Sequence, residues 1–237
     1  MILPLSLRYV LILLGGLLGI SYGNITVPEG YSAIARYEDE FIAAGTDGRI
    51  DRISVSGKVL KSEVFPGVRF NCIASGDDII VAAGNNGTIL IAGEDGIFNE
   101  VESGTARNIN SLAIFNKNII AGCDQGEIIS GDASGSFKKA HLELKGNIVS
   151  VSAGKNDCFG VTDEGEIIHS SDAISWDILD FNSLYSGFYE PCHFTRVLVT
   201  EDWIAVAGIR NDGSPVLMFS TGGKVWTERK LDYTVAQ

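Results

Sequence analysis

The chain has 237 residues and a formal net charge of −12, and 45% of its residues are apolar against 20% that are charged. This apolar fraction is normal for a globular domain, so the composition excludes a disordered chain and a fibrous one. The negative charge opposes binding to nucleic acid and to anionic lipid, and we find no basic patch in the sequence that would offset it.

The first segment has the features of a secretory signal peptide. Its single charge, Arg8, precedes the apolar run Val10–Ile20, and small residues follow that run. The run is shorter than the roughly 20 residues that cross a bilayer, so cleavage is favoured over a retained anchor. We predict a signal peptide over residues 1–23, one folded domain over residues 24–237, and a secreted or periplasmic location.

A repeat with a period of 39 residues follows the leader. Five segments place small or apolar residues before a polar turn that ends in glycine, and the spacings between these glycines are 39, 39, 39 and 48 residues. The glycines are Gly48, Gly87, Gly126, Gly165 and Gly213. A period of this size indicates a repeat architecture in which each unit is one supersecondary structure.

Each repeat contains four short runs with strand character. In the second repeat they are Phe70–Ala74, Ile79–Ala83, Thr88–Ile91 and Phe98–Val101. The Asn-Gly and Asp-Gly turns between them favour antiparallel hairpins, because both residues of such a turn adopt positive φ. Four-stranded units arranged radially are the blades of a β-propeller. We predict an all-β propeller with five antiparallel blades, and a fragment of a six- or seven-bladed propeller is the alternative.

A second element recurs before the fourth strand of the repeats. It is a turn rich in Ser, Asp and Gly that leads to an aromatic residue, as in Ser170–Trp176 and Phe219–Trp226. This element resembles the Asp-box (BNR) repeat of sialidase-like propellers, and with the glycine turn it is most similar to photosystem II assembly factor-like proteins. The resemblance implies a structural turn whose acid accepts backbone N–H groups and whose aromatic residue packs beneath it, and it implies no chemistry. The structural residues are Asp95, Phe98, Phe137, Asp172, Trp176 and Trp226.

The loops that enter the inner strands indicate a candidate ligand site. Successive residues of a strand face opposite sides, so the polar neighbours of each central apolar residue point to the channel. The predicted channel mouth consists of Ser32, Arg69, Asn71, Asn108, Asn110, Asn147, His193 and Thr195. Two interpretations stay open: these side chains bind a polar ligand, or they are solvated strand ends around a water-filled channel.

The loop before the fifth repeat departs from the period. It contains Tyr185, Phe188 and Tyr189, and we expect it to open on the same face as the channel mouth. Aromatic side chains suit sugar rings and protein hot spots, but they also seal gaps between blades, so binding and plugging are equally favoured. The candidate ligand-binding residues are therefore Arg69, Asn71, Asn108, Asn110, Asn147, Tyr185, Phe188, Tyr189 and His193.

The four cysteines lie in different repeats. Cys72 and Cys123 are the pair that adjacent repeats bring near one face, whereas Cys158 is expected to be buried and unpaired. No Cys-x-x-Cys or His-Glu-x-x-His pattern occurs, and no loop with the ligand spacing of a calcium site is present. We predict no metal site and no cofactor.

Catalysis is not expected from this sequence. Glycosidases need two carboxyl groups that flank one bond, about 5 to 9.5 Å apart, but none of the predicted mouth residues is acidic and Glu190 cannot fill both roles. Arg196 is expected to be buried or turned away from the channel, and His193 has no evident nucleophile. We predict a secreted, non-catalytic propeller that binds an extracytoplasmic protein. A glycan-binding, lectin-like propeller is the alternative, and a sialidase-like hydrolase is less favoured.

Overall fold

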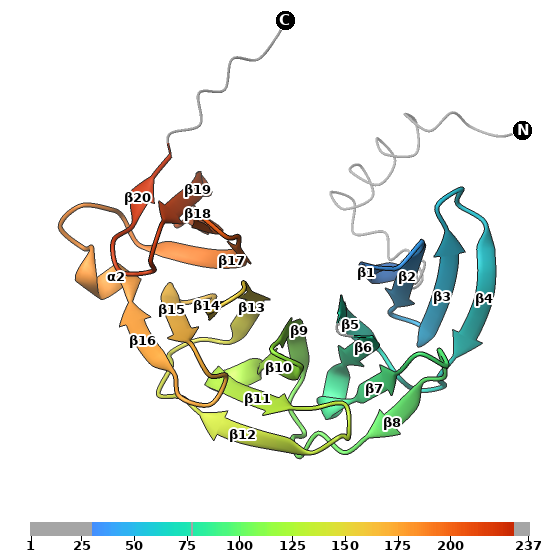
Figure 1. The fold of residues 1–237 in the computed structure, drawn as a ribbon. Helices are drawn as coiled ribbons and strands as arrows, with labels where there is room; N and C mark the ends of the chain where they lie inside the picture. Colours follow the sequence, from blue (N-terminus) through green and yellow to red (C-terminus); the bar gives the residue numbers. More distant parts are fainter. Residues whose placement is uncertain (1–29, 77, 230–237) are drawn as a thin grey trace, which may run out of the picture.

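The computed structural model describes residues 30–76 and 78–229, which form five four-stranded antiparallel sheets (Figure 1). The predicted leader, residues 1–23, lies outside this part of the chain. In each sheet the strands follow one another in chain order, each paired with the next. Within the described ranges, no helix is long and apolar enough to cross a membrane. The predicted all-β propeller with five four-stranded blades is confirmed.

The strands of the first three blades are β1 (Tyr31–Tyr37), β2 (Glu40–Gly45), β3 (Arg49–Ser54), β4 (Val59–Val64), β5 (Phe70–Gly76), β6 (Ile79–Gly84), β7 (Ile89–Ala92), β8 (Asn99–Val101), β9 (Ile109–Phe115), β10 (Asn118–Cys123), β11 (Glu127–Gly131) and β12 (Phe137–His141). Those of the last two blades are β13 (Ile148–Ala153), β14 (Cys158–Thr162), β15 (Glu166–Ser170), β16 (Asp177–Asp180), β17 (Cys192–Val199), β18 (Ile204–Arg210), β19 (Pro215–Ser220) and β20 (Thr227–Glu228). A single helical turn, α2 (Phe181–Leu184), follows β16.

The repeated glycine turns connect the second and third strands of each blade. In the second blade, Asn86 and Gly87 have φ values of 56° and 73°, the left-handed region that Asn and Gly tolerate best. A Cβ atom on Gly87 would lie 2.0 Å from the backbone oxygen of Thr105, so close approach of the following linker also requires glycine here. The glycine that recurs every 39 residues is therefore required by the backbone conformation of the turn between the second and third strands.

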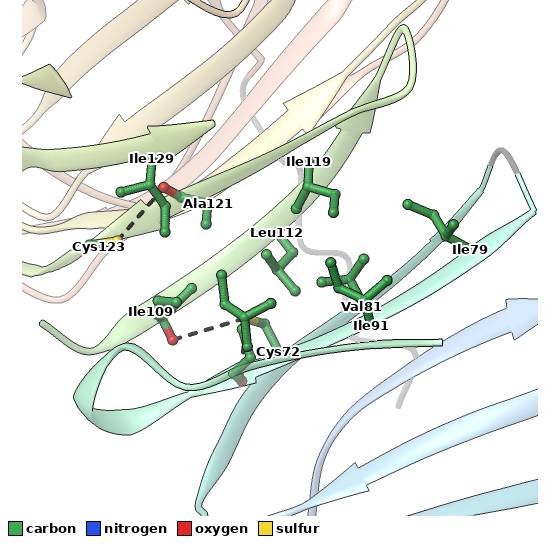
Figure 2. Packing of buried hydrophobic residues seen from close by; sticks show 12 residues of the cluster. Cys72, Ile79, Val81, Ile91, Ile109, Leu112, Ile119, Ala121, Cys123 and Ile129 are labelled. Carbon is green, nitrogen blue, oxygen red and sulfur yellow. Dashed lines mark hydrogen bonds between the residues drawn. The ribbon is translucent and has the colours of Figure 1, made fainter. Parts of the chain in front are cut away.

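The five blades stand side by side along an arc, with their first strands on its inner side and their fourth strands outside (Figure 1). Buried apolar clusters fill the four spaces between consecutive blades, and one of them lies between the second and third blades (Figure 2). There, Val81 and Ile89 of one blade and Ile119 and Ile129 of the next are buried in one cluster. These clusters join the blades, because alternate residues of a central strand face opposite neighbours.

The first and last blades stand at the two ends of the arc and do not pack against each other among the described residues (Figure 1). The outward face of the fifth blade still carries apolar side chains. Ile167 of the fourth blade is buried against the fifth, whereas Leu217, which takes the same register position in the fifth blade, is only half-buried, as is Phe219 on the same face. The five blades therefore do not close a ring in the described part of the chain.

Candidate functional site

The first strand of each blade contains a β-bulge, and in every blade except the fourth the bulged residue is a predicted mouth residue. The register shifts at Ser32, Asn71, Asn110, Val149 and Thr195, so these residues have no cross-strand partner. Three of them donate to a backbone oxygen of the next blade: Ser32 to Phe70 at 2.7 Å, Asn71 to Ile109 at 3.0 Å, and Asn110 to Ile148 at 3.2 Å. Asn71 and Asn110 thus connect neighbouring blades, and ligand contact by them remains a prediction.

A second row of mouth residues connects the glycine turns. Asn147 accepts a hydrogen bond from the backbone N–H of Gln125 in the preceding blade, and its side-chain amide donates to Asp163 of its own blade. Asn108 makes the equivalent pair of bonds, with the N–H of Asn86 and with Asp124. Each side chain therefore bridges two turns, and this bridging uses hydrogen-bonding groups that the ligand-binding interpretation would give to a ligand.

His193 takes the corresponding position in the fifth blade. Its Nδ1 lies 2.7 Å from the backbone oxygen of Asp163, and its Nε2 lies 2.9 Å from Oδ1 of Asn211. Both partners are acceptors, so both ring nitrogens donate only in the imidazolium form. The bond to Asp163, followed by the bond to Asn211, raises the pKa of His193 above its usual value.

This arrangement predicts a pH-dependent contribution of His193 to stability. A raised folded-state pKa gives stabilisation that is fully present below the unfolded-state value of about 6.5 and is lost as pH rises through the folded-state value. We expect His193→Ala to lower the denaturation midpoint more at about pH 5.5 than at about pH 9. Chemical denaturation of both proteins at the two pH values measures this, and an equal loss at both would show that the imidazolium is not the stabilising form.

A shallow hollow opens beside His193 at the inner edge of the fourth and fifth blades. We call it the rim hollow; it has a volume of about 500 Å3. Its lining includes Val149, Asp163, Glu164, His193, Arg196 and Ile209. Arg196 is exposed, so of the two alternatives expected from the sequence, buried or turned away from the channel, the buried one is wrong. Its Nη1 donates to the backbone oxygen of Thr195 at 2.7 Å, and the rest of the guanidinium is available to a ligand.

Arg196 is exposed because it lies at the end of the arc. In the third and fourth blades, Ser111 and Ser150 take this position and accept N–H bonds from Val151 and Val197 of the next blade. No described blade follows the fifth, so Arg196 has no such neighbour. An alignment of the repeats could have indicated that Arg196 is exposed. In that alignment, the charged Arg196 takes the position of the serines that contact the next blade.

Arg69, the remaining mouth residue, is exposed in the second blade. Its side chain makes no hydrogen bond or ion pair with any described residue, so it is a solvated cation. The structure does not bring Arg69 into the rim hollow. The predicted mouth is therefore divided into blade-connecting amides, a separate arginine, and the hollow around His193.

Two of the three loop aromatics pack inside the protein. Tyr185 stacks on Phe181 with ring centroids 4.7 Å apart, and Tyr189 stacks on the same ring at 6.0 Å. Both pack against the cluster between the fourth and fifth blades, and the Tyr185 hydroxyl accepts from the N–H of Trp226 at 3.3 Å. The loop lies beside β16 on the outer side of the arc (Figure 1). This placement favours the plugging interpretation for Tyr185 and Tyr189, whereas Phe188 is 81% exposed.

The turn at Asp172 has the geometry expected for a structural box. Its Oδ1 accepts backbone N–H bonds from Ser175 at 2.7 Å and Ile174 at 2.8 Å, and these bonds lower the pKa of Asp172 to about 2. Asp95 and Asp132 each accept one such bond, from Ile97 and Ser134.

The aromatic residues that follow these turns differ in burial. Trp226 and Phe98 are buried, whereas Trp176 and Phe137 are only partly buried against neighbouring clusters. Trp226 also donates its indole N–H to the backbone oxygen of Gly223 at 3.0 Å. The acidic residues of the boxes therefore stabilise the turns by hydrogen bonds, and the aromatic residues pack against the apolar clusters between blades.

All four cysteines are free and buried. Cys72 and Cys123 share the cluster between the second and third blades without a disulfide between them (Figure 2). Burial raises the pKa of Cys72, and it raises the pKa of Cys123 and of Cys158 to about 12. Their thiols are protonated and unsuited to nucleophilic chemistry. No group of three or more His, Cys, Asp or Glu side chains in the described chain is arranged to hold a metal ion.

Comparison with known proteins identifies the fold. No family model and no curated protein matches the sequence. Solved structures do match: a chain of the mitotic checkpoint complex with a TM-score of 0.70 and 11% identity, YCF48 bound to D1 peptide with 0.63 and 12%, and the β-propeller domain of Myceliophteria thermophila Cps50 (Swd1) with 0.65 and 10%. The matches cover 88%, 87% and 86% of this chain and 66%, 69% and 73% of those chains. Identities this low support a shared β-propeller fold alone.

Proposed function

We propose that this protein is an extracytoplasmic, non-catalytic β-propeller that holds a segment of another protein. The observation that carries the proposal is the rim hollow, where Arg196 and His193 of the fifth blade lie beside apolar groups of the fourth and fifth blades. Its structural relatives include YCF48, which is bound to a D1 peptide in its structure. The proposed location rests on the predicted signal peptide, and the Asp172 turn supports assignment to the Asp-box repeat family.

The chemistry of the rim hollow favours an acidic peptide with an apolar side chain. Arg196 is positive, and the raised pKa of His193 favours its positive form, whereas the chain as a whole has a net charge of −12. Ile209 is 47% exposed in the same hollow and offers an apolar contact. Asp163, which accepts two hydrogen bonds from Asn147, and Glu164 also line the hollow, and both carboxylates oppose an anion, so the attraction depends on a peptide carboxylate that lies beside Arg196. Complementary charge at such a rim gives specificity and faster association.

A random peptide library displayed on phage tests this proposal. We expect selected peptides to share a carboxylate next to an apolar residue, and we expect Arg196→Ala to weaken their binding by about tenfold. Weakening should be greater at low salt, because the attraction is between exposed charges. Binding is measured by titration calorimetry on synthetic copies of the selected peptides.

Arg69→Ala is the matched control, because it removes an exposed arginine from another blade of the same face. It should leave binding within about twofold of the parent protein. Equal losses in Arg69→Ala and Arg196→Ala would indicate a general charge effect and contradict a site at the rim hollow. Failure to enrich any peptide, together with binding to a glycan array, would favour the lectin alternative for the protein as a whole.

A further inference from the structure

The outermost strand of the first blade is a long sheet edge. The fourth strand of each blade pairs on one side with the third strand and lies on the outer side of the arc, so its other side has no strand beside it in the described chain (Figure 1). β4 has six residues, whereas β8, β12, β16 and β20 have three, five, four and two. An unpaired edge presents free N–H and C=O groups and is a template for another strand.

Exposed apolar side chains follow the edge of β4. Val59, Leu60 and Val64 are 49%, 50% and 59% exposed, and every residue of this strand except Glu63 is exposed. Natural proteins commonly shorten such an edge or guard it with charge, because a long apolar edge attracts further strands. Pairing along β4 would remove part of this apolar surface from water, which favours association.

The charges on β4 differ from those on the other outer strands. β12 carries Lys138 and Lys139 without an acid, whereas β8, β16 and β20 carry acids without a base. Among the outer strands that the structure describes, β4 alone carries both signs, as Lys61 and Glu63, with Nζ and Oε1 2.9 Å apart. Two copies of any other outer strand could form no ion pair with each other, so their charges oppose self-pairing.

The sequence of β4 is complementary to itself when two copies run antiparallel. With Ser62 opposite Ser62 of a second copy, each Lys61 lies opposite a Glu63 and each Leu60 lies opposite a Val64. Cross-strand pairs of opposite charge and of apolar side chains stabilise an antiparallel ladder. A shift by one residue in either direction separates both charge pairs, so the side chains select this register.

We infer that two copies of this chain associate by antiparallel pairing of β4 with β4, with a two-fold axis at Ser62. Opposite residues of antiparallel strands point to the same side of a sheet, so the four strands of each first blade continue into those of the other copy. The interface is isologous, and each contact away from the axis therefore occurs twice. β4 keeps its pairing with β3 on the inner side, so the blade needs no rearrangement.

Sedimentation velocity of the purified full chain over a range of concentrations tests this inference. We expect a monomer–dimer equilibrium that weakens at high salt. Lys61→Glu should weaken dimerisation by at least about tenfold, because the two-fold axis turns one substitution into two like-charge contacts, and Glu63→Lys should do the same. The double variant Lys61→Glu with Glu63→Lys should dimerise like the parent, since it restores opposite charges in the same register. The ion pair within one chain is exposed, so the melting temperature should change little in all three variants.

A matched pair of valine variants separates this edge from the other end of the arc. Val64 and Val225 are both exposed, on β4 and in the fifth blade respectively. Val64→Lys should weaken dimerisation, whereas Val225→Lys should leave the dissociation constant within about twofold of the parent.

Four outcomes would overturn the inference. The chain stays monomeric at about 1 mM; the single charge variants dimerise like the parent; the double charge variant does not recover dimerisation; or Val225→Lys blocks association and Val64→Lys does not, which would indicate pairing through the fifth blade. The rim hollow contains no residue of the first blade, so neither result decides the peptide proposal.

Discussion

Replacing Trp226 by alanine should lower the free energy of unfolding by about 3 to 5 kcal/mol, which is the usual loss for a large buried aromatic. Trp226 is 2% exposed and packs against the cluster between the fourth and fifth blades. Its indole N–H donates to Gly223 across the preceding turn, so the substitution also removes a hydrogen bond. Denaturant unfolding followed by circular dichroism measures the change.

Trp176→Ala is the control for this prediction. Trp176 takes the equivalent place in the fourth blade but is only partly buried, against the cluster between the third and fourth blades. Its loss should therefore be clearly smaller. If both variants lose the same stability, burial of the indole is not what distinguishes the two turns.

The double variant Tyr185→Ala with Tyr189→Ala should lower the free energy of unfolding by about 3 kcal/mol or more. Both rings stack on Phe181, and the Tyr185 hydroxyl accepts from the Trp226 N–H and donates to the Lys224 backbone oxygen at 3.4 Å. The substitution therefore opens a cavity in a buried aromatic group between two blades. Thermal and denaturant unfolding of the double variant measure the loss.

Phe188→Ala is the matched change in the same loop. Its ring is 81% exposed, so we expect its stability to stay within about 0.5 kcal/mol of the parent. A double tyrosine variant that unfolds normally and instead loses a bound partner would show that the loop is a recognition surface.

The sequence was sufficient for the repeat, the blades and their strands. The observed strands of the second blade differ from the predicted ones by at most two residues at each end, because glycine turns and apolar runs mark them directly. Alternation is visible within a single segment, and the period is found by comparing segments of one sequence, so neither requires knowledge of contacts between blades. The turn at Asp172 was also readable from its sequence, since its hydrogen bonds join residues at most three positions apart.

The arrangement between blades could not be read in the same way. Whether five blades meet depends on small rotations at each contact, which no single residue encodes. The contacts of Asn71, Asn110 and Asn147 with neighbouring blades span 22 to 38 residues, and those of Asn71 and Asn110 also depend on a bulge that alternation alone does not predict. The stacking of Tyr185 on Phe181 follows from the single turn α2, which is too short to show a helical period.

The serial contacts of the arc make the five described blades a linear array rather than a ring. Among residues 30–76 and 78–229, each inner blade packs between two neighbours, whereas the first blade packs against the second alone, with contacts that include Ile42, Ile50 and the bond from Ser32 to Phe70. In such an array, stability is the sum of terms within each unit and terms between neighbours, so a terminal unit opens at a lower free energy than an internal one. Opening should thus begin at the ends, and slow amide exchange should be concentrated in the middle blades, where Val81, Ala121 and Ile129 have no exposed surface.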